Sequence, residues 1–115
     1  MINVAAGLAS CGKTVLVFGI SSFVTFRCYE QLRFNVCSMN LPVIIAGIGS
    51  GFAFSHDGPT HHGTQDVAVM RALPEMTIYC PGDTVAAQAC ARLSLACQGP
   101  VYVRVDKGSF PALHD

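Results

Sequence analysis

Four short apolar runs, each separated from the next by a longer segment, constrain the fold of this chain more than any other feature. Runs of this length suit strands that are buried on both faces, as in parallel sheets. The segments between them are long enough for helices, and strands that alternate with helices form βα units. We therefore predict an α/β fold, a three-layer domain with a mostly parallel sheet flanked by helices. The predicted strands are VLVF (15–18), PVIIAG (42–47), TIYC (77–80) and VYVRV (101–105).

Helical periodicity and terminal signals predict helices at 2–10, about 23–37, 64–73 and 84–98. Gly19 is expected to end the first strand, Ser21 or Ser22 to cap the second helix, and Asp83 to cap the last. On that last helix one apolar face is expected to hold Ala86, Ala89, Cys90, Leu93 and Cys97.

The start of the chain is unusual for this architecture, because a doubly wound domain seldom opens with a helix that no strand precedes. We therefore expect one domain, 1–115, that is incomplete at its N-terminus, with its first strand missing. A parallel sheet that lacks a strand leaves an unpaired edge, which favours association with other chains.

Composition narrows the function classes. The net charge is zero with no basic block, so neither nucleic acid nor an acidic membrane surface is an expected partner. The uncharged run 34–56 is interrupted by Asn, Ser, Pro and Gly, so it predicts no membrane-spanning helix. No secretory signal is recognisable, so we expect a cytoplasmic protein whose six cysteines are reduced, buried thiols. The 51% hydrophobic content predicts apolar surface that packs against a partner.

The stretch HDGPTHHGTQD (56–66) holds three of the four histidines. It belongs to a predicted loop, 48–63, at the carboxyl end of a strand, where open α/β sheets bind ligands. That loop is longer than the roughly 2–6 residues usual for a βα connection. A metal held by His56, Asp57, His61 and His62 is disfavoured, because adjacent histidines on a loop seldom face the same way and the H-E-x-x-H type of spacing is absent. Acid–base or substrate-binding histidines and a loop that is merely well pinned both remain open.

The order of motifs along the chain points to a family. The chain contains G-x-x-S-F-V-T-F-R-C-Y-E-Q-L-R from Gly19, then NLPVIIAG, then DGPTHHGTQDVAVMRALPEMTIYCPGD, then GPVYVR. This order resembles the pyrimidine-binding domain of transketolase-like thiamine diphosphate enzymes, and the split transketolases are most similar. The resemblance covers essentially the whole chain, and the long third motif is specific.

The resemblance implies a place for the cofactor and roles for individual residues. In such enzymes thiamine diphosphate lies between two subunits, and aromatic side chains of the helix after the second strand stack on its aminopyrimidine ring. Phe23 and Phe26 match two stacking positions, and Ile20 occupies the third. The matching substrate-facing residues are Asp57, expected to contact substrate hydroxyls, and His61, expected to bind near the reacting carbon and move protons. His62 is expected to have a weaker substrate role, and Lys107 lies near a phosphate-binding position, although it also suits a solvated lysine.

Departures from the family pattern limit what the chain is expected to do alone. The family's activating glutamate, in a G-x-x-E-Q type motif, would precede Met1, and many transketolases have a histidine near the position of Gly49. The diphosphate-binding domain, which holds Mg²⁺, would be a separate domain or subunit.

We therefore expect a fragment or subunit of a thiamine diphosphate-dependent transketolase-type enzyme that transfers ketol units on sugar or sugar-phosphate-like substrates. It should form a homo- or hetero-oligomer and be inactive as an isolated chain. The alternative is a non-catalytic shortened paralogue that acts as a binding or subunit-interaction module.

Overall fold

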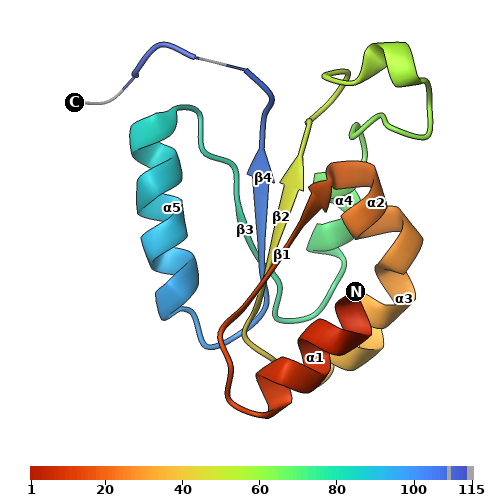
Figure 1. The fold of residues 1–115 in the computed structure, drawn as a ribbon, viewed down its shortest axis with the longest axis vertical. Helices are drawn as coiled ribbons and strands as arrows, with labels where there is room; N and C mark the ends of the chain where they lie inside the picture. Colours follow the sequence, from red (N-terminus) through yellow and green to blue (C-terminus); the bar gives the residue numbers. More distant parts are fainter. Residues whose placement is uncertain (109, 114–115) are drawn as a thin grey trace.

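The computed structural model describes residues 1–108 and 110–113. It contains a four-stranded, fully parallel sheet with strand order β1-β2-β4-β3, as the alternating pattern predicts. Helices lie on both faces of the sheet: α1 to α4 cover one face and α5 covers the other (Figure 1). The strands are β1 (Val15–Ile20), β2 (Val43–Ile48), β3 (Thr77–Tyr79) and β4 (Val101–Val105).

Strand β1 runs two residues further than predicted, through Gly19, so the expectation that Gly19 ends it is wrong. Gly19 pairs with Gly47 of β2 inside the parallel ladder. A Cβ at Gly19 would lie 2.8 Å from Cγ1 of Val24, so the glycine lets the next helix pack closely on the strand. The glycine here serves close packing rather than a chain break.

The helical segment after β1 spans the predicted range but is irregular. It consists of α2 (Ser21–Thr25), η1 (Phe26–Cys28), α3 (Tyr29–Gln31) and the π-helical η2 (Leu32–Cys37). Thr25 Oγ1 donates to the carbonyl of Ser21 at 2.6 Å, and Cys28 Sγ lies 3.2 Å from the carbonyl of Val24. Such side-chain bonds to the preceding turn compete with the helical ladder and bend it.

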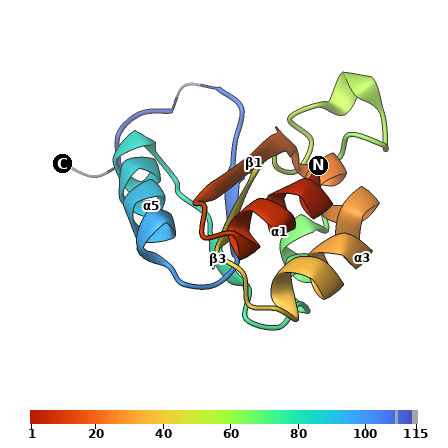
Figure 2. The same ribbon diagram turned by 60° about the horizontal axis from the view of Figure 1, so that its bottom comes forward.

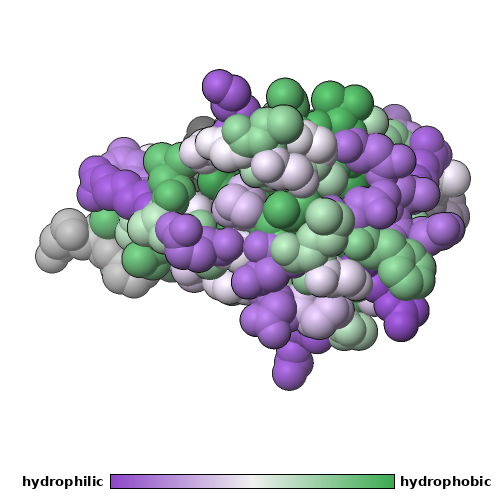
Figure 3. Space-filling view, turned by 90° about the horizontal axis from the view of Figure 1, so that it is seen from below, coloured by the Kyte–Doolittle hydropathy of each residue, from purple (hydrophilic) through white to green (hydrophobic). Residues whose placement is uncertain are grey.

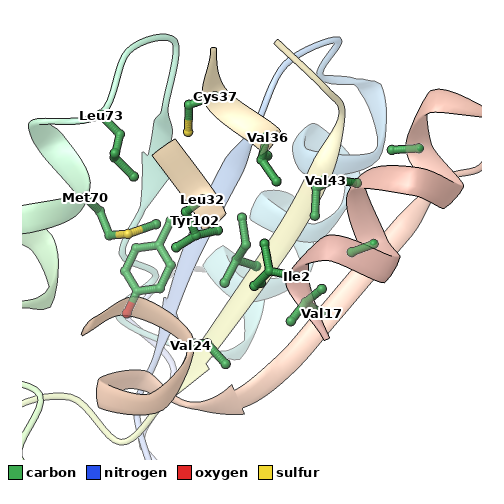
Figure 4. Close-up of a cluster of buried hydrophobic side chains, with 14 residues drawn as sticks. Ile2, Val17, Val24, Leu32, Val36, Cys37, Val43, Met70, Leu73 and Tyr102 are labelled. Carbon is green, nitrogen blue, oxygen red and sulfur yellow. The ribbon is translucent and has the colours of Figure 1, made fainter. Parts of the chain in front are cut away.

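The main core lies between the sheet and helices α1 to α4, where Leu32, Met70 and Tyr102 are fully buried (Figure 4). Helix α1 (Ile2–Ser10) contributes Ile2, Ala5, Ala6 and Ala9, which follow helical spacing and confirm the first predicted helix. Helix α4 (Asp66–Arg71) is shorter than the predicted 64–73.

The opposite face is covered only in part, by α5 (Thr84–Ala96), which lies apart from the other helices in Figure 2. Asp83 caps this helix as predicted, since its Oδ1 accepts from the amide of Ala86 at 2.7 Å. The predicted apolar face is correct only in part: Cys97 packs against the cluster of Ile44, Val101 and Val103, whereas Leu93 is 54% exposed and Ser94 is buried. A small residue lies against the sheet at this position, and the larger leucine points away from it.

Apolar surface remains uncovered beside α5. On the edge strand β1, Leu16 is 63% and Phe18 62% exposed, because no helix of the described chain covers them. A groove of about 330 Å³, lined in part by Leu16, Ile44, Leu95 and Val103, continues between α5 and the sheet. Seen from below, apolar and polar side chains are interspersed over the surface (Figure 3).

Among the described residues, no helix is both long enough and apolar enough to cross a membrane.

Candidate functional site

The candidate site lies at the carboxyl ends of the strands, where the long loop after β2 rises above the sheet beside α2 (Figure 1). The loop contains a single turn of 3-10 helix, η3 (Ser55–Asp57), and then Gly58, whose φ of 81° is accessible mainly to glycine. This conformation turns the chain so that the histidines return toward α2. The loop lies at the carboxyl ends of the strands, as predicted, which is where open α/β sheets bind ligands.

His61 meets two aromatic rings. Its ring centroid lies 4.7 Å from that of Phe23, in an edge-to-face arrangement, and 6.4 Å from that of Phe54. The Nζ atom of Lys107 lies 4.6 Å from the Phe54 ring. Of the residues singled out from the sequence, His61 thus contacts Phe23, and both His61 and Lys107 lie near Phe54, a residue that sequence reasoning missed.

The other predicted residues are spread around this cluster. Asp57 is exposed at the end of η3, and Ile20 is the last residue of β1. Phe26 is 36% exposed, one turn beyond Phe23. The ring of His62 packs against a different residue, Phe52, at 4.9 Å.

The two histidines differ in their polar surroundings. Oγ1 of Thr60 lies 3.0 Å from Nδ1 of His61, which leaves Nε2 as the ring nitrogen that Thr60 does not engage. In His62 the Nε2 atom is buried and finds no hydrogen-bond partner among the described residues. His61 is thus the better placed of the two for a ligand at the surface.

An ionic cluster lies beneath the loop. Asp66 is fully buried, and its Oδ2 accepts from the hydroxyl of Tyr102 at 2.8 Å and from Nε of Arg104 at 3.0 Å. Burial, and then the hydrogen bond to Asp66 and its charge, raise the pKa of the Tyr102 phenol above its usual range. Tyr102 therefore stays neutral and donates to the carboxylate.

The cysteines whose pKa is shifted are not activated as nucleophiles. All six are free thiols, and burial raises the pKa of Cys28, and that of Cys37 to about 11. A raised pKa leaves little thiolate at neutral pH. The expectation that the cysteines are buried holds only for Cys37: Cys28, Cys90 and Cys97 are half-buried, and Cys11 and Cys80 are exposed.

Within the residues that the structure describes, no group of three or more His, Cys, Asp or Glu side chains is arranged to hold a metal ion. Gly49, which stands near a family histidine position, has a φ of 81°, and the Phe54 ring fills the space that a side chain would need. A histidine there would require Phe54 to move away from His61.

One known protein family matches almost the whole of this chain. Residues 1–112 match the family model described as transketolase, pyrimidine binding domain. The chain belongs to this family.

This transketolase pyrimidine-binding domain has relatives of two kinds. It is 34% identical over 114 residues to one of the subunits of apulose-4-phosphate transketolase from Phocaeicola vulgatus, a match that covers 99% of the chain and 36% of the relative. It is 40% identical over 108 residues to 1-deoxy-D-xylulose-5-phosphate synthase of Syntrophus aciditrophicus, covering 94% of the chain and 16% of the relative. The domain thus spans little more than a third, or less, of the length of these proteins.

Solved structures share the fold of the transketolase pyrimidine-binding domain. One, described as a split gene transketolase, inactive beta4 tetramer, superposes with a TM-score of 0.87 at 31% identity, over 99% of this chain and 36% of the other. The transketolase of Campylobacter jejuni superposes with a TM-score of 0.90 over 100% of this chain and 18% of the other; at 18% identity it supports the fold alone.

Proposed function

We propose that this domain contributes the aminopyrimidine-binding surface and the substrate-facing loop of a thiamine diphosphate-dependent, transketolase-type enzyme. The observation that carries the proposal is the packing of His61 against Phe23 at the carboxyl ends of parallel strands. These two residues come from separate motifs that are 38 positions apart. Their contact joins the aromatic surface proposed for the cofactor to the loop proposed for the substrate.

The aromatic surface suits a flat ring. The Arg27 guanidinium lies over the Phe23 ring, with Cζ 4.1 Å from the ring centroid. A guanidinium is planar and stacks on aromatic faces much as a heterocycle does. Arg27 is an exposed residue and can leave that face, so Phe23 can accept the aminopyrimidine in its place. When bound, thiamine diphosphate supplies a carbanion equivalent for making and breaking bonds beside a carbonyl.

Each of the other predicted site residues of this chain has a proposed role. Phe23 stacks on the ring, while Phe26 and Ile20 border it. His61 binds the substrate near the reacting carbon and moves a proton through Nε2, since Thr60 engages Nδ1. Asp57 contacts substrate hydroxyls from its exposed position. Lys107 attracts an anionic group, and His62 supports the loop through Phe52.

A second domain or subunit completes the site in this proposal. It would hold the diphosphate and Mg²⁺, and the assembled enzyme would transfer a ketol unit on a sugar or sugar-phosphate-like substrate. The similar split transketolase that is described as inactive is a tetramer of one subunit type. We therefore expect no ketol transfer by this chain alone. That relative also supports the second candidate, a non-catalytic module that binds subunits.

Ligand binding by the isolated chain tests the aromatic surface. The probe is 4-amino-5-hydroxymethyl-2-methylpyrimidine, the ring portion of the cofactor, followed by saturation-transfer NMR. Phe23→Ala should abolish the transfer signal. Phe34→Ala is the matched control, because Phe34 is also exposed and carries a cation, Arg33, at 5.3 Å from its ring. Equal loss in both variants, or no loss in either, would contradict the proposal.

Reconstitution tests the catalytic role. Ketol transfer should appear only when the chain is combined with a diphosphate-binding transketolase subunit, thiamine diphosphate and Mg²⁺. His61→Ala should then lower kcat/KM by roughly 10²–10⁴-fold, the usual contribution of an acid–base residue. Two results with the chain alone would contradict the proposal that a second domain completes the site. One is turnover, and the other is micromolar affinity for thiamine diphosphate with Mg²⁺ in calorimetry. Ring binding without turnover in any combination would favour the module.

A further inference from the structure

The loop 49–63 is fastened to the domain at its base. Gly51 and Gly63 exchange backbone hydrogen bonds of 2.9 Å in each direction, which closes the two ends of the loop on each other. Ser21 Oγ donates to the carbonyl of Gly49 at 3.0 Å, and Arg104 Nη2 donates to the carbonyl of Gly63 at 3.1 Å. The Gly63 oxygen therefore accepts two hydrogen bonds, one from within the loop and one from β4.

Arg104 is held in place by a buried group. Its Nε bonds to Asp66 in α4, whose carboxylate also accepts from Tyr102. A guanidinium presents several donors in a rigid plane, so fixing Nε also fixes the direction of Nη2. Arg104 thus joins β4, α4 and the loop through one planar group, a geometry that a lysine ammonium cannot reproduce.

The returning side of the loop is attached to α2 separately. The buried Ser22 donates from Oγ to the carbonyl of Thr60 at 2.8 Å. Ser22 immediately precedes Phe23, and Thr60 immediately precedes His61. This one hydrogen bond therefore ties together the backbones that carry the two rings found 4.7 Å apart.

A capping role does not account for Ser22. The helix that begins at Ser21 has Ile20 as its N-cap, and no side chain caps it. The expectation that Ser21 or Ser22 caps this helix is thus wrong, and both hydroxyls bond to the loop instead. The ion pair of Arg104 with Asp66 likewise does not account for the hydrogen bond that Arg104 Nη2 donates to the carbonyl of Gly63.

We propose that Ser22 and Arg104 are positioning residues, which set the place of His61 by holding the loop at Thr60, on its returning side, and at its base. The relevance of this placement to ligand binding rests on the proposed function. The placement itself is a property of the chain without ligand and can be measured separately.

NMR on the whole chain can test the two attachments independently. The ring current of Phe23 shifts the side-chain protons of His61, and Ser22→Ala should move them toward random-coil values. Exchange of the Gly51 amide reports the base of the loop, and Arg104→Lys should accelerate it roughly tenfold, the effect expected for one lost hydrogen bond. Lysine keeps the positive charge beside Asp66, so the urea midpoint of Arg104→Lys should stay close to the wild-type value even though the Gly51 amide exchanges faster.

Ser38→Ala is the control, since Ser38 Oγ makes a similar bond of 2.8 Å, to Arg33, away from the loop. It should leave both signals unchanged. If Ser22→Ala leaves the His61 chemical shifts at their wild-type values, the proposal for the Ser22 attachment is overturned. If the Gly51 amide of Arg104→Lys exchanges at the wild-type rate, the proposal that Arg104 holds the base of the loop is overturned.

The same variants separate this inference from the proposed function. If the aminopyrimidine probe fails to bind the wild-type chain while the loop signals still respond as expected, the positioning role stands and the proposed function fails. If the probe binds equally well to the wild type and to Ser22→Ala, although His61 has moved, the positioning role in ligand binding is refuted and the aromatic surface stands.

Discussion

Gly47 of β2 lies where the domain has no room for a side chain. A Cβ there would lie 2.6 Å from Oη of Tyr102, 2.8 Å from its Cε2 and 3.1 Å from Cα of Ser21. Tyr102 is fully buried and held by Asp66, and the third atom belongs to the backbone of α2. Gly47→Ala can therefore be accommodated only if Tyr102 or the backbone of α2 shifts.

The size of the effect follows from these contacts. Inserting a methyl group into a packed core costs about 1–3 kcal/mol. If the Tyr102 hydroxyl is pushed off Asp66, the loss of a bond to a charged group adds about 1.5–3 kcal/mol. The lower entropy of an unfolded chain with alanine offsets about 0.4–1 kcal/mol. When the bond to Asp66 is lost, the net loss is about 1.5–5.5 kcal/mol, or roughly 6–22 °C in melting temperature for a domain of this size.

Urea unfolding followed by far-ultraviolet circular dichroism measures this loss. Gly7→Ala is the matched control, because it makes the same chemical change on α1, where a Cβ meets nothing within 4 Å. It should raise the free energy of unfolding by about 0.5–1 kcal/mol, since alanine favours the helix. The two variants must therefore move the urea midpoint in opposite directions at an unchanged m-value. A Gly47→Ala midpoint at or above that of the wild type would refute the packing argument.

Two further predictions concern pH and association. Burial raises the pKa of Cys37 from 9.0 to about 11, so unfolding releases a proton in that range and the free energy of unfolding should fall from pH 9 upward, by at most about 1.4 kcal/mol per pH unit for this group. Cys37→Ala should show a shallower decline in urea titrations, and an identical slope would exclude Cys37 as its source. The exposed Leu16 and Phe18 should cause self-association at micromolar concentration, which Phe18→Ser reduces in sedimentation velocity and Phe52→Ser, on the loop, does not. A monomeric wild type would argue against this surface as an interface.

The strands were predictable from the sequence because each is a short apolar run buried between two layers. Their observed ends fall within about two residues of the predicted ones, and the largest error, at Gly19, came from treating a packing glycine as a chain break. The face of α5 was mispredicted at Leu93 for a related reason. Hydrophobicity alone favoured Leu93, whereas the sheet accepts the smaller Ser94.

The loop after β2 was predictable as a segment, but the side chains that meet around it were not. Its length, its glycines and its place after a strand are local properties, as is the motif that identifies the family. Phe54 carried no signal of its own, because an aromatic residue in a loop has many uses. Ser22 and Arg104 resembled an ordinary cap and an ordinary strand residue, since their partners lie 38 and 41 positions away.

The sequence by itself determined the alternation of strands and helices, the strand end at which ligands are expected to bind, and the family. These depend on burial patterns that repeat over a few residues and on contiguous motifs. Only the tertiary structure decided which side chains meet. The contact of His61 with Phe23, the bonds of one guanidinium to Asp66 and Gly63, and the uncovered Leu16 and Phe18 depend on how distant segments cross and pair in the sheet. That geometry is set by the packing of the whole domain, and no local stretch of the chain encodes it.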